Sequence, residues 1–135
     1  MSEDEVLEVL DEEQCRSLIQ SRNLGRIAFT IEGVPEIFPI NYAADGSTVV
    51  FRTAADTRLQ AAAKHRVAFE VDDWDPTAGV GWSVVVKGIA EEITRGIDPF
   101  AVALRSRPVI PLAPGAREVW IAVYPAEITG RRIRR

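Results

Sequence analysis

Two residue types that carry much of protein chemistry are almost missing from this sequence of 135 residues, which has one cysteine, Cys15, and one histidine, His65. A single cysteine excludes a disulfide within the chain, and the two residues together are too few ligands for a zinc site. No apolar run reaches the ~20 residues that a membrane-spanning helix needs. We therefore expect a protein of a reducing, cytoplasmic compartment, in which difficult chemistry comes from an organic cofactor or from the substrate.

Positive charge is absent from the first 13 residues, which hold seven of the 20 acidic side chains and do not resemble the basic start of a secretory signal. The remaining residues carry 13 acidic and 16 basic side chains, so a mildly basic body can bind an anion. We interpret residues 1–13 as an acidic N-terminal segment and residues 14–135 as one domain. The arginine-rich residues 131–135 lack interleaved aromatic residues, so we expect a solvated terminus and no nucleic-acid partner.

Hydrophobic periodicity predicts a mainly β domain with short helices. Residues 11–22 fit a helix that Asp11 caps, with Gln14 at the capping-box position. From Leu24 apolar side chains alternate with polar ones, which is typical of a half-buried strand. The expected strands run from Leu24 to a hairpin at 32–33 and over residues 36–43, 48–53, 67–72, 81–93 and 119–124. The expected helices lie at 11–22 and 57–64, and a third, of two turns, begins at Asp98 and Pro99. Residues 108–115 are expected to form a loop, and residues 125–135 to trail off after the last strand.

Six short strands with inserted helices favour a six-stranded antiparallel split β-barrel, closed or nearly closed. Gly88, near the middle of the long strand at 81–93, indicates a bulge or bend in that strand. A doubly wound parallel sheet is disfavoured, because strands and helices do not alternate regularly and no glycine-rich phosphate loop follows a strand.

One segment, at the end of the strand 48–53, combines two hydroxyls with two guanidinium groups: Arg52, Thr53, Thr57 and Arg58. Hydroxyl donors, guanidinium groups and the backbone N–H groups of a helix N-terminus are the groups that bind a phosphate. In the alternative interpretation Asp56 or Thr57 only caps the helix and the arginines are surface residues. The residues of this segment do not decide between the two.

Two further segments suit a planar ring. Trp82 and Ser83 stand at the start of a strand, where an aromatic wall and a polar donor can meet a ring, although tryptophan in a small barrel is more often structural. Pro39 cannot donate to a sheet ladder, so residues 39–42 belong at an edge or an interrupted pairing whose free backbone groups can address a ligand. Asn41 adds a donor and an acceptor. A bulge explains residues 39–42 equally well.

The order of these motifs resembles the pyridoxamine 5′-phosphate oxidase-like family, and looks most like its short actinobacterial branch near the nitroimidazole-resistance proteins. The resemblance covers about residues 14–132. It rests on residues 24–28, 39–42, 51–53 with 57–58, and 81–91, and the closing Trp120, Pro125 and residues 128–131 also fit. It implies the FMN-binding split β-barrel, usually a homodimer with two flavin sites at the subunit interface.

The resemblance also assigns roles to single residues. Thr53, Thr57 and Arg58 would bind the FMN phosphate, with Arg52 as a further contact. The strand that would lie along the isoalloxazine consists of Pro39, Ile40, Asn41 and Tyr42. Trp82 and Ser83 would meet the polar edge of the ring, from the other subunit in the family arrangement.

Two departures from the family pattern affect the function that we expect. Leu59 stands where the oxidase has a lysine, and the oxidase's C-terminal substrate-binding extension is absent, so vitamin B6 oxidation is not expected. We predict an FMN-dependent oxidoreductase that transfers hydride or electrons to a small molecule. A reductase that uses the deazaflavin F420 and a non-catalytic flavin carrier or interaction domain remain as alternatives. No catalytic triad emerges, and no catalytic residue is assigned.

Overall fold

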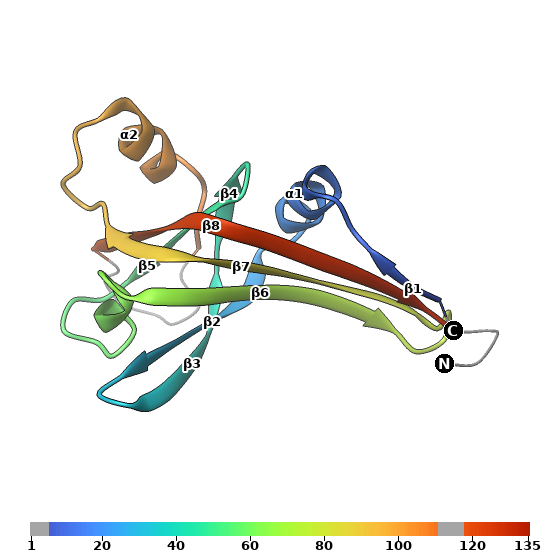
Figure 1. Ribbon diagram of the computed structural model, residues 1–135. Helices are drawn as coiled ribbons and strands as arrows, with labels where there is room; N and C mark the ends of the chain where they lie inside the picture. Colours follow the sequence, from blue (N-terminus) through green and yellow to red (C-terminus); the bar gives the residue numbers. More distant parts are fainter. Residues whose placement is uncertain (1–5, 111–117) are drawn as a thin grey trace.

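Strands dominate the computed structural model, which describes residues 6–110 and 118–135 (Figure 1). The strands are β1 (Val6–Val9), β2 (Leu24–Ile31), β3 (Val34–Asn41), β4 (Ala43–Asp45), β5 (Thr48–Thr53), β6 (Arg66–Asp75), β7 (Val80–Glu92) and β8 (Val119–Arg134). The helices are α1 (Glu12–Gln20), the 3₁₀ turn η1 (Gln60–Ala62) and α2 (Pro99–Arg105). Within the described ranges, no helix combines the length and the apolar character that crossing a bilayer requires.

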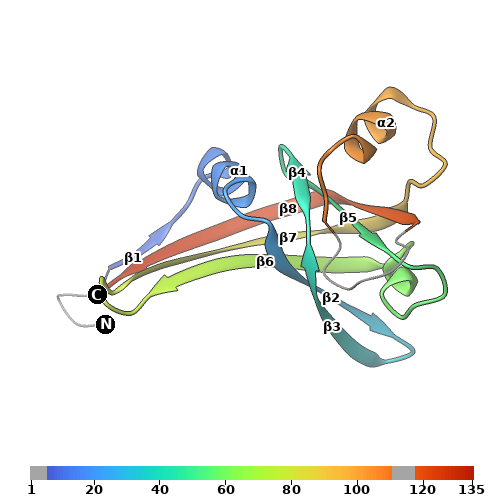
Figure 2. The same cartoon turned by 180° about the vertical axis from the view of Figure 1, so that it is seen from behind.

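The eight strands form one antiparallel sheet that curls into a barrel-like shape (Figures 1 and 2). The strand order is β3-β2-β6-β7-β8-β5-β4, and β1 pairs with the end of β8. In Figure 1, β6, β7 and β8 run the length of the molecule, and the hairpins β2–β3 and β4–β5 lie toward its left-hand half. The expected antiparallel, split-barrel fold is confirmed, with eight strands in place of six and with no pairing that joins β3 to β4 among the described residues.

The main hydrophobic core lies on the face of the sheet that α1 covers. Alternate residues of β2, β6 and β7 point into it, among them Ile27, Phe69 and Val84, none of which has exposed surface. Cys15 and Ile19 of α1 pack against them and are equally buried. Each large apolar side chain buried here contributes roughly 1.5–3 kcal/mol. Burial also raises the pKa of the Cys15 thiol, which agrees with an inert core cysteine.

Both α-helices begin at the predicted caps. Asp11 Oδ1 accepts a hydrogen bond from the Gln14 N–H at 2.8 Å, and Gln14 Oε1 accepts one from the Asp11 N–H at 2.9 Å, which closes the capping box. Asp98 Oδ2 accepts from the Ala101 N–H at 3.0 Å, with Pro99 as the first helical residue. These two predictions are confirmed.

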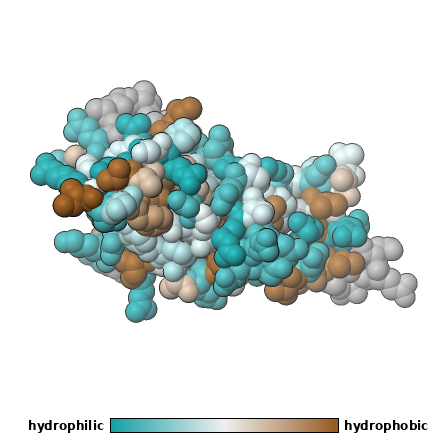
Figure 3. All heavy atoms as spheres, turned by 90° about the horizontal axis from the view of Figure 1, so that it is seen from above, coloured by the Kyte–Doolittle hydropathy of each residue, from teal (hydrophilic) through white to brown (hydrophobic). Residues whose placement is uncertain are grey.

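A second apolar cluster lies on the opposite face of the sheet, beneath α2. Val50 of β5 and Ala122 of β8 pack there with Ala101 and Leu104 of α2. Apolar side chains also stay exposed at the end of the molecule that carries α2, where brown spheres gather in Figure 3. These exposed residues are Ile97, Phe100, Val102 and Ile110. The two faces of the sheet are therefore covered at different ends, by α1 and by α2.

The register between β7 and β8 shifts at Gly88. Lys87 pairs with Glu127 and Gly88 pairs with Pro125, so Ala126 is an extra residue on β8. The predicted bulge is confirmed. Because ladder hydrogen bonding is already interrupted at a bulge, the missing N–H of Pro125 is tolerated there. β8 therefore does not end at Tyr124 as predicted but continues to Arg134, and residues 131–134 belong to the sheet instead of forming a solvated tail.

Other expectations also need correction. The helix predicted at 57–64 is reduced to the single turn η1, because Ala63 has a ψ of 136° and Lys64 has a φ of 71°, which a right-handed helix does not allow. The short strands β1 and β4 were not predicted, and they pair with β8 and β5. Of the predicted loop at 108–115, residues 108–110 are irregular and the rest lies outside the described residues.

Candidate functional site

Two of the predicted phosphate ligands meet at the end of β5. Thr53 is the last residue of that strand, is 5% exposed, and places its Oγ1 3.1 Å from Oγ1 of Thr57. Thr57 Oγ1 donates to the Ala54 carbonyl at 2.9 Å and accepts from the Gln60 N–H at 3.2 Å. Since the one hydroxyl proton of Thr57 is used on Ala54, Thr53 is the donor in the threonine pair. The tight turn after β5 thus brings the hydroxyl of the buried Thr53 against that of the exposed Thr57.

Arg58, the next residue of the same turn, is bound to β3. Its Nε donates to Oε1 of Glu36 at 2.8 Å, and its Nη2 donates to the same oxygen. The Glu36 side chain is 19% exposed and the Arg58 side chain 60% exposed. The remaining N–H groups, on Nη1 and the far side of Nη2, have no acceptor among the described residues. Arg58 therefore keeps one guanidinium edge for an outside anion while the other edge is held by β3.

Arg52 lies on the other face of β5 from Thr53, because successive residues of a strand point to opposite sides. Its guanidinium lies 5.0 Å from the centre of the Trp120 ring, and its Nη1 donates to the Val109 carbonyl at 3.4 Å. The structure therefore gathers Thr53, Thr57 and Arg58 in one turn and holds Arg52 on the opposite face.

Residues 39–42 divide between the two sides of the sheet. Ile40 and Tyr42 are core residues, 3% and 2% exposed. The Tyr42 hydroxyl donates to the Ile19 carbonyl at 2.5 Å, and burial raises the pKa of that hydroxyl. Pro39 and Asn41 point to the other side. β3 is the last strand of the sheet path, so one row of its backbone groups faces away from β2, as the edge position predicted for Pro39 requires.

Trp82 and Ser83 lie on β7, three strands from β3 in the sheet order. Neighbouring strands are about 4.8 Å apart, so roughly 14 Å of sheet separates these residues from β3 within one chain. Trp82 packs against the main core, and the guanidinium of Arg22 lies 5.5 Å from its ring centre. Ser83 lines a shallow hollow of about 460 Å³ beside Trp74. A single chain therefore does not bring Ser83 to Asn41.

An ionic cluster on the outward face was missed by the sequence reasoning. Arg26 of β2 is in register with Pro39 on one side and with Glu70 on the other. Its Nη2 lies 2.6 Å from Oε1 of Glu70 and 2.9 Å from Oδ2 of Asp72. Burial and the neighbouring Asp72 raise the pKa of Glu70, whereas the hydrogen bond with Glu70 and the charge of Arg26 lower the pKa of Asp72. The outward positions of the alternating strands were the signal that could have found this cluster.

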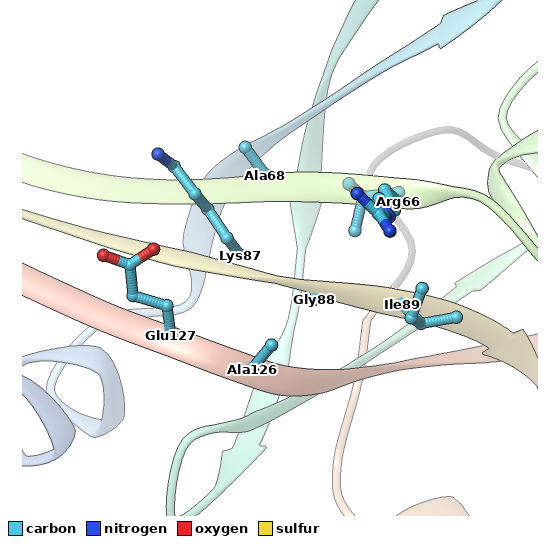
Figure 4. Close-up of a pocket in the computed structure, with 8 residues that line it drawn as sticks. Arg66, Ala68, Lys87, Gly88, Ile89, Ala126 and Glu127 are labelled. Carbon is cyan, nitrogen blue, oxygen red and sulfur yellow. The ribbon is translucent and has the colours of Figure 1, made fainter.

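A second hollow, of about 530 Å³, lies on the outward face at the Gly88 bulge (Figure 4). Lys87 and Glu127 stand at one end of it, and Arg66 and Ile89 at the other (Figure 4). No predicted site residue lines this hollow. The outward face of β6, β7 and β8 therefore combines exposed apolar surface with charges of both signs.

Comparison with known proteins decides the family. Residues 11–132 match the protein family described as pyridoxamine 5′-phosphate oxidase. The chain belongs to this family. The resemblance noted in the order of the sequence motifs is thus confirmed, and the barrel-like antiparallel fold agrees with it.

Several known proteins are similar to this member of the pyridoxamine 5′-phosphate oxidase family over most of their length. The uncharacterized protein Rv0080 of Mycobacterium tuberculosis is 36% identical over 135 residues, which cover 96% of this chain and 86% of the relative. The solved structure of the FAD binding protein from Mycobacterium smegmatis is 37% identical, with a TM-score of 0.79 and coverage of 93% and 98% of the two chains. A FAD-binding protein from Mesorhizobium loti, at 21% identity and a TM-score of 0.73, covers 94% and 98% and shows the shared fold.

Proposed function

We propose that this protein binds a flavin nucleotide at the turn after β5 and acts as an oxidoreductase. The observation that carries the proposal is the contact between the Thr53 and Thr57 hydroxyls, 3.1 Å apart, next to an arginine with one unused guanidinium edge. The similarity to the FAD binding protein of M. smegmatis, at 37% identity over 93% of this chain, supports a flavin as the ligand.

The residues of the turn fit the phosphate end of such a cofactor. The two hydroxyls can donate to phosphate oxygens if each gives up its present acceptor, which is Thr57 Oγ1 for Thr53 and the Ala54 carbonyl for Thr57. Arg58 can bond two phosphate oxygens in bidentate fashion. Within strand β3, about 16 Å of extended chain separates Glu36, which is bound to the turn, from Asn41, and this stretch leads from the phosphate toward the ring position.

The edge of β3 and the side chain of Asn41 would address the ring, whose rim carries both donors and acceptors. A bound flavin would supply the hydride or electron transfer, and the protein would bind it, orient it and shield it. The ionic cluster of Arg26, Glu70 and Asp72, adjacent to Pro39 in the sheet, would provide charge near the ring.

We also propose that two chains share the cofactor sites as a homodimer. Because Ser83 lies roughly 14 Å from β3 in its own chain, it can meet the same ring as Asn41 only from a second chain. The outward face of β7 and β8 beside Ser83 carries Val85, Ile89 and the oppositely charged Lys87 and Glu127, which suits a self-complementary contact. Light scattering should give twice the chain mass for the wild type, and Val85→Arg should lower it. A monomeric wild type would contradict this arrangement.

The absorption spectrum of the freshly purified protein tests the cofactor class directly. We expect the two visible bands of an oxidised flavin, or their appearance after FMN or FAD is added, together with quenching of tryptophan fluorescence. The sequence resemblance favoured FMN, the similarity to the FAD binding protein of M. smegmatis favours FAD, and F420 provides the third titration. A colourless protein that binds none of the three would contradict the proposal and would favour an interaction domain without cofactor.

A further inference from the structure

The turn after β5 carries an excess of negative charge. Residues 54–62 and the side chains bonded to them contain one guanidinium, of Arg58, and three carboxylates, of Glu36, Asp56 and Glu92. Glu36 binds two nitrogens of Arg58, and Glu92 Oε1 accepts from the Gln60 side chain at 3.2 Å. Much of the positive charge of the turn is therefore neutralised before any ligand arrives.

Two other sources of positive potential are weaker here than the sequence suggested. Arg52 faces the opposite side of the sheet, against Trp120. The turn η1 is three residues long, and so short a helix has no useful macrodipole for an anion. Leu59 adds no charge at the position where the resemblance places a lysine. Within residues 54–62, Arg58 alone supplies a full positive charge, and the exposed Lys64 follows two residues later.

The charge of the ligand therefore matters at this site. A phosphate monoester, such as the end group of FMN, carries nearly two negative charges at neutral pH. Each phosphorus of a pyrophosphate or other diester carries one. A second negative charge about 6 Å from a carboxylate weakens binding about threefold even in a medium as polar as water, and more where water is partly excluded.

We propose that Glu36 is a specificity-determining residue that favours a flavin whose phosphate groups carry one charge each, such as FAD, over the dianionic monoester FMN. It does so in two ways: it holds the Nε edge of Arg58 so that the Nη1 edge can bind a phosphate, and it repels a second negative charge. The inference rests on the proposed flavin function and names the class of cofactor that this site selects.

The test compares dissociation constants for FMN, FAD and riboflavin in the wild type and in Glu36→Gln, which keeps the shape of the side chain and removes its charge. The wild type should bind FAD more tightly than FMN. In Glu36→Gln the ratio of FMN to FAD affinity should rise at least about threefold, mainly through tighter FMN binding. Riboflavin, which has no phosphate, should bind both proteins equally.

Glu32→Gln is the matched control, because Glu32 is an exposed carboxylate on the same β2–β3 hairpin and has no ion pair among the described residues. It should leave the FMN to FAD ratio unchanged. Glu36→Ala is the second variant, for use if Glu36→Gln folds poorly. It should change the ratio of FMN to FAD affinity in the same direction. Flavin binding with an unaltered ratio in both Glu36 variants overturns the role of Glu36 and leaves the proposed function intact. Absence of any flavin binding by the wild type overturns both.

Discussion

Gly88 and Tyr124 meet backbone to backbone where β7 bulges against β8. A Cβ atom at Gly88 would overlap the carbonyl oxygen of Tyr124 and would crowd Pro125 as well. Because the neighbours are backbone atoms of a paired strand, no change of side-chain rotamer can make room. This close approach lets the two longest strands stay paired on both sides of the bulge.

Gly88→Ala should therefore destabilise the protein by roughly 3 kcal/mol, at the upper end of the usual cost of overpacking. Urea unfolding followed by circular dichroism measures the change. Gly33→Ala is the control: Gly33 has a φ of 79° but open space around it, so only the backbone cost of about 1 kcal/mol is expected. Equal losses in the two variants would contradict the proposed clash at Gly88.

Arg58 and Arg52 should differ in their effect on cofactor affinity, although the sequence interpretation placed both at the phosphate. Arg58→Ala should weaken flavin nucleotide binding by about 1.5–3 kcal/mol, since it removes a charged hydrogen bond to the phosphate. Arg52→Ala should change that affinity by less than about 0.5 kcal/mol, because Arg52 faces Trp120 on the other side of the sheet. Calorimetric titration of both variants decides, and an equal loss would restore Arg52 to the phosphate site.

Tyr42 should act through the core and not through the ligand. Tyr42→Phe removes the hydrogen bond to the Ile19 carbonyl and should cost about 1 kcal/mol of unfolding free energy. Flavin affinity should remain within about twofold of the wild type, because the hydroxyl points toward α1. Tyr124→Phe is the control, since no hydrogen-bond partner of the Tyr124 hydroxyl occurs among the described residues. A large loss of flavin binding in Tyr42→Phe would place this side chain at the ring instead.

Glu70 should give the stability a characteristic dependence on pH. Its pKa is raised, so the folded protein holds this proton more tightly than the unfolded chain does. The resulting stabilisation is fully present below the ordinary value of 4.5 and is lost as the pH rises through the raised pKa. Asp72 acts in the opposite sense, because its lowered pKa stabilises the fold above its ordinary value and this contribution is lost in acid.

The variant Glu70→Gln lacks this pH-dependent contribution. Its free energy of unfolding should therefore rise relative to that of the wild type as the pH is raised from about 4 to about 7. Urea midpoints of Glu70→Gln and the wild type at the two pH values measure this difference. Glu32→Gln, which alters an exposed carboxylate outside this cluster, controls for the loss of one carboxylate. If the wild type instead becomes more stable relative to Glu70→Gln as the pH rises, the direction assigned to the pKa shift of Glu70 is wrong.

Local physics made much of the fold readable from the sequence. The alternation after Leu24 predicted strands because one face of each strand must be buried, and Asp11 and Asp98 predicted helix starts because their carboxylates satisfy free N–H groups. Gly88 predicted a bulge through its missing side chain. The same local rules failed at residues 57–64, where favourable helix propensities did not prevent the non-helical backbone of Ala63 and Lys64.

The sequence by itself determined the fold class, the caps, the bulge and the pair of threonines, since each depends on residues only a few positions apart. Only the tertiary structure decided that Arg58 is held by Glu36, 22 residues away, and that Arg52 faces the opposite side of the sheet. Strand pairing joins distant segments, and the side of the sheet to which a residue points follows from register and not from composition. The charge that a bound phosphate would meet is therefore a property of the assembled sheet.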